Sequence, residues 1–329
     1  MRLFAITLMI TALLPTLGMA ECNGRDLRAT LSETEAAELD AFRAKTPFGT
    51  GNRWVARRGA QEIQIVGTMH LNDPRWPEIV ARIRPALKGA ELLMIEMTDD
   101  EQARMKRAMS QDPSRAFITQ GPTLPDRMSD VDWQRLSDAM AKRGMPSFMV
   151  AKTQPWFLSL MLGIPACVLS QGEAGQNGLD KRLIEIAQET GIPSVGLERH
   201  EDLFAIFTEQ SIDAQLRLLL ASLPMAEQSD DQFATVVARY FDQDNAGAWA
   251  MADIIAQRGG GIPDAELDAM MNDLRERLLD RRNAMWMDKI LPRTERHIFI
   301  AVGALHLMGE AGLLHALQQA GYQIERLPF

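Results

Sequence analysis

Cysteine and basic residues are scarce in this sequence, and each scarcity excludes a class of protein. Only two cysteines occur among 329 residues, and neither stands at a spacing used by metal ligands, which excludes a cysteine-held zinc module. Lysine and arginine number 35 against 44 acidic residues, which gives a net charge of -9. Since no basic stripe interleaved with aromatic residues occurs either, we expect no nucleic-acid partner.

Long apolar runs are also lacking, except near the N-terminus. Arg2 precedes an apolar segment from Leu3 to Leu14, which is too short to remain as a membrane helix. Gly18-Met19-Ala20 then supplies a small-x-small cleavage site, so residues 1–20 are predicted to be a signal peptide that is cleaved after Ala20. We expect the mature protein to keep no stable membrane span and to be periplasmic or secreted in a bacterium.

Both cysteines, Cys22 and Cys167, lie in the predicted mature chain. In an oxidising compartment they could form a disulfide that tethers the new N-terminus; the alternative is two unrelated thiols, one of them buried. Lipidation of Cys22 is not expected, because Glu21 occupies the position where a lipid-attachment site needs a small residue.

Length and composition indicate one large α/β unit. A chain that is 46% hydrophobic and 24% charged can bury a sizeable core, and we expect a single α/β domain over residues 21–329. Within it, residues 99–170 carry amphipathic, Met- and Ala-rich segments broken by prolines, so we predict a helical insertion or cap there.

One short motif occurs twice. Val-Gly-x-x-His-Leu covers residues 66–71 and again 302–307, and each copy follows a β-branched run typical of a short buried strand. A glycine directly after a strand lets the chain turn sharply, which places His70 and His306 just beyond two strand ends. We therefore predict a central mixed β-sheet built from two strand-Gly-x-x-His units and flanked by helices.

Other elements follow from periodicity and end signals. Two further strands end in an acid, Glu96 and Glu198. The predicted strands are 54–56, 62–66, 92–96, 193–198, 298–302 and 322–327, and the clearest predicted helices are 33–44, 77–88, 179–190, 264–290 and 310–320.

Four strand ends thus carry His70, Glu96, Glu198 and His306. Ligands of open α/β sheets bind outside the carboxyl ends of the strands, so these side chains could face one cavity. Two imidazoles with one or two carboxylates suit a borderline divalent metal such as Zn, Mn, Co or Fe. In the alternative interpretation each histidine caps the following helix and each glutamate is a solvated strand end.

A series of landmarks runs across nearly the whole predicted mature chain: Gly67-Thr68-Met69-His70-Leu71, the strand ending at Glu96, Gly196-Leu197-Glu198, Arg282-Asn283-x-x-Trp286, Val302 to Gly309 and a final Gly-Tyr strand. In this order they resemble the TraB/GumN family, which is related to the Tiki metalloproteases and more distantly to erythromycin esterases and ChaN-like haem-binding proteins. The resemblance implies an α/β core with a helical insertion and a pocket of two histidines, a glutamate and an arginine, here His70, His306, Glu96 and Arg282.

These residues can be given roles in hydrolysis. A metal held by His70 and His306 with Glu96 or Glu198 would activate water and polarise a carbonyl, and a second carboxylate could accept the proton. Arg282 could stabilise the oxyanion or bind a substrate carboxylate; alternatively it forms an ordinary helix salt bridge. His200, His297 and His315 lack the strand-turn context and are read as exposed or helix-terminal.

Three functions are compatible with the sequence. The leading prediction is a secreted metal-dependent hydrolase that acts on a peptide or small acyl substrate. The alternatives are a metal-independent esterase, in which His70 and Glu96 form the general base and His306 and Arg282 act as electrophiles, or a non-catalytic module that sequesters haem or a peptide pheromone.

Overall fold

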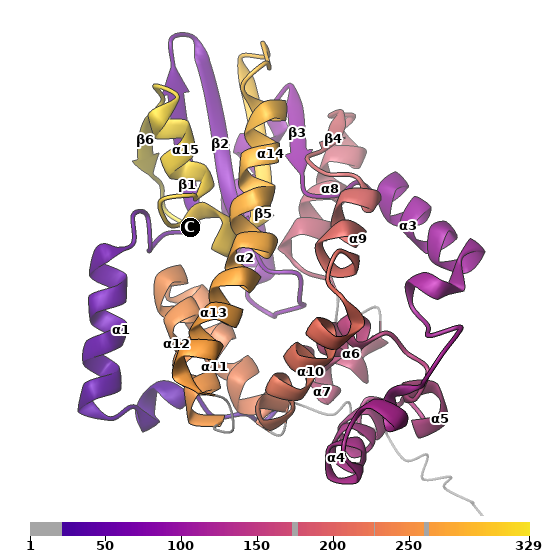
Figure 1. The fold of residues 1–329 in the computed structure, drawn as a ribbon. Coiled ribbons are helices and arrows are strands. Elements are labelled where there is room, and N and C mark those ends of the chain that lie inside the picture. Colours follow the sequence, from indigo (N-terminus) through magenta and orange to yellow (C-terminus); the bar gives the residue numbers. More distant parts are fainter. Residues whose placement is uncertain (1–21, 173–176, 227, 260–262) are drawn as a thin grey trace, which may run out of the picture.

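A computed structural model describes residues 22–172, 177–226, 228–259 and 263–329. The predicted signal peptide, residues 1–20, lies outside these described residues. The molecule has a sheet with helices on both faces in its upper half and a layer of helices below it (Figure 1).

The sheet has six strands in the order β4-β3-β5-β2-β1-β6. β2, β5, β3 and β4 run parallel, whereas β1 pairs antiparallel with both β2 and β6, so the sheet is mixed as predicted. The two strand-Gly-x-x-His units lie side by side at its centre, with Gly67 opposite Val302 and Thr68 opposite Gly303. The strands are β1 (Arg53–Arg58), β2 (Gln61–Thr68), β3 (Leu92–Ile95), β4 (Ser194–Gly196), β5 (His297–Gly303) and β6 (Gln323–Arg326).

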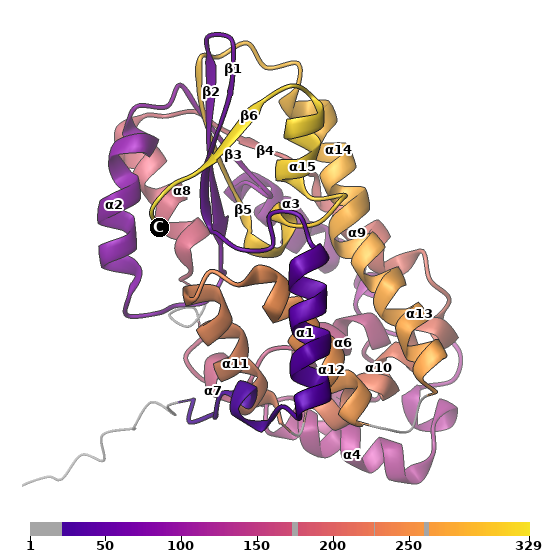
Figure 2. The same cartoon turned by 90° about the vertical axis from the view of Figure 1, so that its left-hand side faces the viewer.

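Alternating side chains along the strands build a core on each face of the sheet. Ile63, Ile65 and Ile300 face one way and pack with α14 (Arg281–Ile290) and α15 (Leu313–Gln319). Val66, Phe299 and Ala301 face the other way and pack with α2 (Trp76–Lys88) and α8 (Leu179–Thr190). Figure 2 shows these two helix pairs on opposite sides of the sheet. The apolar residues on both faces explain why the central strands read as continuous hydrophobic runs.

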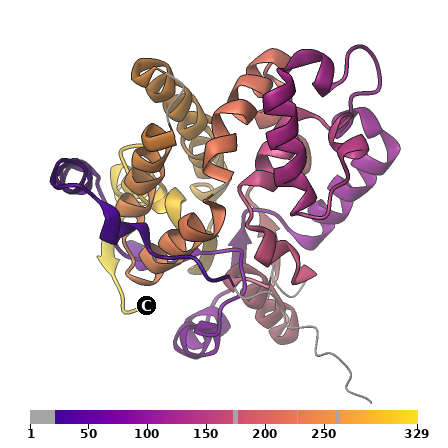
Figure 3. The ribbon, with the colours of Figure 1, turned by 90° about the horizontal axis from the view of Figure 1, so that it is seen from below.

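Helices dominate the segment predicted as an insertion, residues 99–170. They are α3 (Asp99–Gln111), η2 (Pro113–Arg115), η3 (Leu124–Arg127), α4 (Asp130–Ala141), α5 (Ser147–Val150), α6 (Pro155–Leu162) and α7 (Ala166–Leu169). Their apolar residues share a core with Leu216, Leu219 and Leu223 of α10 (Ile212–Ala226). The helical layer is therefore built from two stretches of the chain, which lie next to each other when seen from below (Figure 3).

The second stretch completes the layer. It contains α9 (His200–Thr208), α11 (Ser229–Phe241), α12 (Asn245–Gly259), α13 (Asp264–Arg275) and a π-helical turn, η5 (Glu276–Asp280), that leads directly into α14. The predicted helix 264–290 is thus present, with a π turn inside it. Such turns occur often at functional sites, and this one ends two residues before Arg282.

The N-terminal part of the described chain packs on the same layer. η1 (Leu27–Thr30) precedes α1 (Glu33–Lys45), and the predicted capping box is present, with Ser32 and Glu35 each bonding the other's backbone N–H. Leu39 of α1 packs with Met251 and Ile254 of α12. No helix in the described part of the chain combines the length and apolar character needed to cross a bilayer.

Cys22 and Cys167 form a disulfide with a Cα–Cα distance of 5.4 Å. Of the two alternatives left open by the sequence, the structure contains the tether. It joins the start of the described chain to α7, 145 residues away. A disulfide of this kind persists in oxidising compartments.

Candidate functional site

The four predicted strand-end side chains lie at one edge of the sheet. β4, β3, β5 and β2 are parallel and consecutive, so their carboxyl ends, followed by Glu198, Glu96, His306 and His70, face the helical layer together (Figure 1). Arg282 reaches this edge from the first turn of α14. The sequence prediction that distant residues converge here agrees with the arrangement of the strands.

Arg282 lies at the centre of this group. Its Nε donates to Glu198 Oε2 (2.8 Å), and its Nη2 donates to Glu198 Oε1 (2.6 Å) and to Glu96 Oε2 (2.7 Å). Its Nη1 donates to the carbonyl of Leu278 (3.0 Å) and to His306 Nε2 (3.0 Å). A guanidinium has five N–H groups, so all of them are used within the protein and none is free to contact a substrate.

The two glutamates differ in access and charge. Burial raises the pKa of Glu198, which is 3% exposed, although the Arg282 guanidinium opposes the shift. Burial opposes ionisation of Glu96 too, but the charges of His306, Arg282 and His70, together with the N–H of Gly303 (2.6 Å), lower its pKa to about 2. Glu96 is therefore ionised at neutral pH, and with 16% of its side chain exposed it is the carboxylate that solvent can reach.

His306 is buried and has partners on both ring nitrogens. Asn283 donates through Nδ2 to the carbonyls of His306 (3.2 Å) and Ala311 (2.9 Å), so its Oδ1 faces His306 Nδ1 at 2.8 Å as an acceptor. The ring proton is therefore on Nδ1, and Nε2 accepts from Arg282. Burial lowers the pKa of His306 to about 3; the charge of Glu96 opposes the shift and the charge of Arg282 reinforces it. The ring is neutral at neutral pH and packs against Trp286, with ring centroids 4.3 Å apart.

His70 has the opposite character. Its Nδ1 lies 3.2 Å from Asp180 Oδ2, in the first turn of α8, and 61% of its side chain is exposed. Partial loss of water opposes protonation, but the hydrogen bond and charge of Asp180, with the charge of Glu96, raise the pKa of His70. The pKa rises to about 9, so His70 is protonated at neutral pH.

The backbone brings α8 close to His70. The N–H of Leu179 donates to the Met69 carbonyl (3.0 Å), and a Cβ on Gly178 would lie 2.3 Å from the carbonyl carbon of His70. Only glycine leaves room for this approach. The start of α8 therefore rests against the loop that carries His70, which places Asp180 beside the ring.

The predicted metal ligands do not form a ready metal site in this arrangement. Both nitrogens of His306 are already hydrogen-bonded, and its Nε2 faces a guanidinium. Within the described residues, one group of three or more His, Cys, Asp and Glu side chains has all its ligand atoms within 4.8 Å of one another: Glu101, His200 and Glu201. The possible metal-binding group is therefore made of other residues, and a metal on His70, Glu96 and His306 stays a prediction.

Two further histidines, His200 and His297, each stand at the start of an element. His200 begins α9, as predicted for a helix-terminal residue, and it is 8% exposed. It is buried because Glu101 of α3 and Phe204 pack against its ring. His297 is exposed at the start of β5, as predicted.

Two site residues were missed by the sequence analysis. Asp180 gives no signal, since an acid in the first turn of a helix is ordinary. Asn283 lies within the Arg-Asn-x-x-Trp landmark but received no role. Arg282 and Trp286 are four residues apart and therefore lie on one face of a helix. The spacing of this landmark could have indicated that this helix face points to the site.

Comparison with known proteins assigns relatives to the chain. The model of the TraB/PrgY/gumN family matches residues 52–326. The chain is 22% identical over 260 residues to the uncharacterized protein YbaP of Escherichia coli (strain K12), and the match covers 79% of this chain and 89% of that protein. The protein of the same name from Shigella flexneri matches with the same identity and coverage.

Proposed function

The chain belongs to the TraB/PrgY/gumN family, and from that premise we propose that it is an exported hydrolase that cleaves a peptide or other acyl bond at the carboxyl edge of its parallel strands. The observation that carries the proposal is the opposite charge of two accessible neighbours. Glu96 is an anion and His70 a cation at neutral pH, and each shifts the pKa of the other. Surroundings that push the pKa values of two titratable groups apart in this way are typical of a catalytic acid and base pair.

In this mechanism Glu96 accepts the proton of a water molecule as the water oxygen bonds to the substrate carbonyl carbon. His70, held by Asp180, then donates a proton to the leaving nitrogen or oxygen as the bond to the carbonyl carbon breaks. Arg282 touches no substrate here. It is a positioning residue, because its five donors are bound to Glu96, Glu198, His306 and Leu278.

In the metal-dependent form of this function, His306 Nε2 has to bind a metal ion in place of the Arg282 guanidinium. The guanidinium is held by Glu198 through two hydrogen bonds and by Glu96 through one, so this exchange would break a buried network. We therefore place the metal-free hydrolase first. Export is supported by the Cys22–Cys167 disulfide, because such bonds are kept mainly outside the cytoplasm.

The test is hydrolysis of p-nitrophenyl esters and of a fluorogenic peptide library by the purified chain and its variants. We expect His70→Gln and Glu96→Gln each to lower kcat/KM by about 100-fold or more, the usual contribution of a general acid or base. His297→Gln is the matched control, because His297 is exposed at the opposite end of β5. Activity equal to that of the unchanged chain in both site variants would refute the proposal.

Chelation separates the two forms of hydrolase. Activity that survives exhaustive removal of divalent metal supports the acid and base mechanism. If activity disappears on removal and returns with Zn²⁺ or Mn²⁺, and if His306→Gln abolishes that return, the metal-dependent form is correct.

A further inference from the structure

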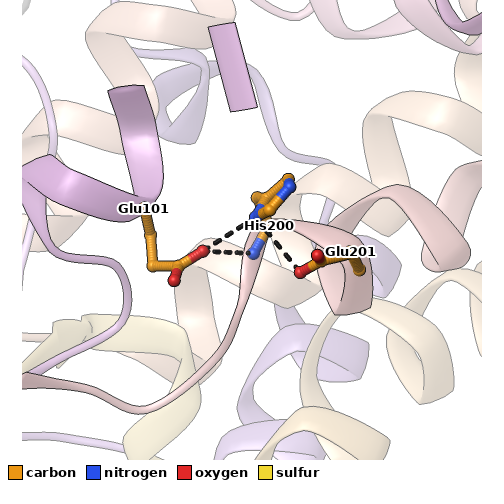
Figure 4. A group of neighbouring side chains, drawn as sticks. All are labelled: Glu101, His200 and Glu201. Atoms are coloured by element: carbon orange, nitrogen blue, oxygen red, sulfur yellow. Dashed lines mark hydrogen bonds and ion pairs between the residues drawn. The ribbon is translucent and has the colours of Figure 1, made fainter. Parts of the chain in front are cut away.

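A second cluster of titratable side chains lies on the two helices that follow β3 and β4. Glu101 is in the first turn of α3, and His200 and Glu201 begin α9. Glu101 Oε2 and Glu201 Oε2 both approach His200 Nδ1, at 2.8 and 3.1 Å (Figure 4). The three side chains therefore point to one place from two separate segments, about 100 residues apart in sequence.

We propose that Glu101, His200 and Glu201 bind a divalent cation. One imidazole nitrogen and two carboxylate oxygens form a donor set that suits Zn²⁺ and its neighbours among the borderline metals. Such ions bond these atoms at about 2.0–2.2 Å, which separates neighbouring ligand atoms by roughly 3.3 Å in a tetrahedral site. The observed spacings are a few tenths of an ångström below this value, so a cation needs only a small outward movement of the two carboxylates.

The surroundings of the cluster fit a partly open site. His200 is 8% exposed, and its backbone N–H also donates to Glu101 Oε2 (3.1 Å), which fixes that carboxylate against the ring. Glu201 is on the open side, with 53% of its side chain exposed, so it gives an ion access from solvent. Three protein ligands leave coordination positions that water can fill.

Neighbouring charges limit the affinity without blocking the site. Arg104 lies 3.4 Å from the other oxygen of Glu101, Oε1, and Arg199 is paired with Asp202 at 3.2 Å. The positive ends of α3 and α9 also disfavour a cation, and the two carboxylate charges have to outweigh them. We therefore expect weaker binding than in a closed site with four protein ligands.

The cation would connect this cluster to the candidate active site. α3 follows the loop that carries Glu96, and α9 follows the loop that carries Glu198, and both loops leave paired strands. An ion that joins the first turns of the two helices would hold both loops in place. This inference does not rest on the proposed hydrolysis, because it concerns different side chains and a binding measurement tests it.

The test is isothermal titration of ZnCl₂ into the untagged chain after removal of metal with a chelator. We expect one equivalent to bind, with at least a tenfold loss of affinity in Glu101→Gln and in His200→Gln. Glu325→Gln and His297→Gln are matched controls for each residue type; both side chains are exposed, Glu325 lies on β6 at the border of the sheet opposite β4, and binding should be unchanged.

A folding defect is distinguished by a third variant. Glu201→Gln changes a half-exposed side chain, so it should keep the melting temperature of the metal-free chain and still weaken binding by about tenfold. Affinity unchanged in all three cluster variants, or no binding by the unaltered chain, would overturn the inference. Binding lost in His70→Gln but kept in His200→Gln would overturn it too, and would assign the metal to the set predicted from sequence.

Discussion

Replacing Arg282 by leucine tests whether its guanidinium is the buried centre of the site. The change removes all five donors and leaves Glu198, which is 3% exposed, without its partner. Breaking a buried ion pair by removing one member costs roughly 3–5 kcal/mol. A separate argument gives a loss of unfolding free energy of similar size. The orphaned Glu198 carboxyl can escape its charge by taking up a proton, and doing so at pH 7 costs about 3 kcal/mol for a group whose ordinary pKa is 4.5.

The second argument also predicts a pH dependence. Protonating the orphaned carboxyl becomes easier by about 1.4 kcal/mol for each pH unit below 7. The difference in unfolding free energy between the unaltered chain and Arg282→Leu should therefore be about 3 kcal/mol at pH 7 and should narrow as the pH falls to 5. For a chain of this size the loss at pH 7 lowers the melting temperature by roughly 5 °C.

The adjacent arginine supplies the control. Arg281 is 52% exposed and pairs with Glu276 on the surface, so Arg281→Leu should cost less than about 1 kcal/mol and show no narrowing with pH. Differential scanning calorimetry of the three chains at pH 7, 6 and 5 makes the comparison. Equal melting temperatures for the two variants would refute the account of Arg282 as a buried cation. A difference between the unaltered chain and Arg282→Leu that stays constant with pH would refute it too.

Two further predictions concern stability. The unfolded chain protonates His306 near pH 6.5 but the folded chain does so only at about 3, so unfolding free energy should fall as pH drops from 6.5 towards 3, by up to about 1.4 kcal/mol per unit from this group. His306→Gln should flatten that slope in urea titrations at pH 6.5 and 4.5, and the same slope in both chains would contradict the buried neutral ring. The double change of Cys22→Ser and Cys167→Ser should lower the free energy of unfolding by roughly 2–5 kcal/mol, because the bond closes a loop of 145 residues; denaturation with and without reductant measures it, and no effect of reductant would count against the tether.

The sequence predicted which residues end the central strands because that information is local. A β-branched run followed by glycine marks the strand ends before His70 and His306, and an acid ends each of the two other predicted strands. Parallel strands place such ends at one edge of the sheet. The sequence alone therefore predicted that four side chains meet at this edge: His70, Glu96, Glu198 and His306. The order of the strands, which puts β5 between β2 and β3, depends on packing across the whole chain and needed the structure.

The partners of these residues could not be read in the same way. Arg282 was predicted to reach a substrate, but whether any of its donors is free depends on how α14 crosses the strand ends. Asp180 meets His70 only because α8 begins against the loop after β2, across 110 residues of sequence. His200 was expected at a helix end, which is local, whereas its burial depends on α3.

The short outer strands of the sheet have a consequence for self-association. β4 has three residues and β6 has four, so each border of the sheet offers only a brief row of unpaired backbone groups. Proteins often use brief borders of this kind to prevent another chain from adding on as an extra strand, which is how sheets grow into aggregates. The long, strongly apolar central strands are thereby kept away from any border where a strand of a neighbouring molecule could pair with them.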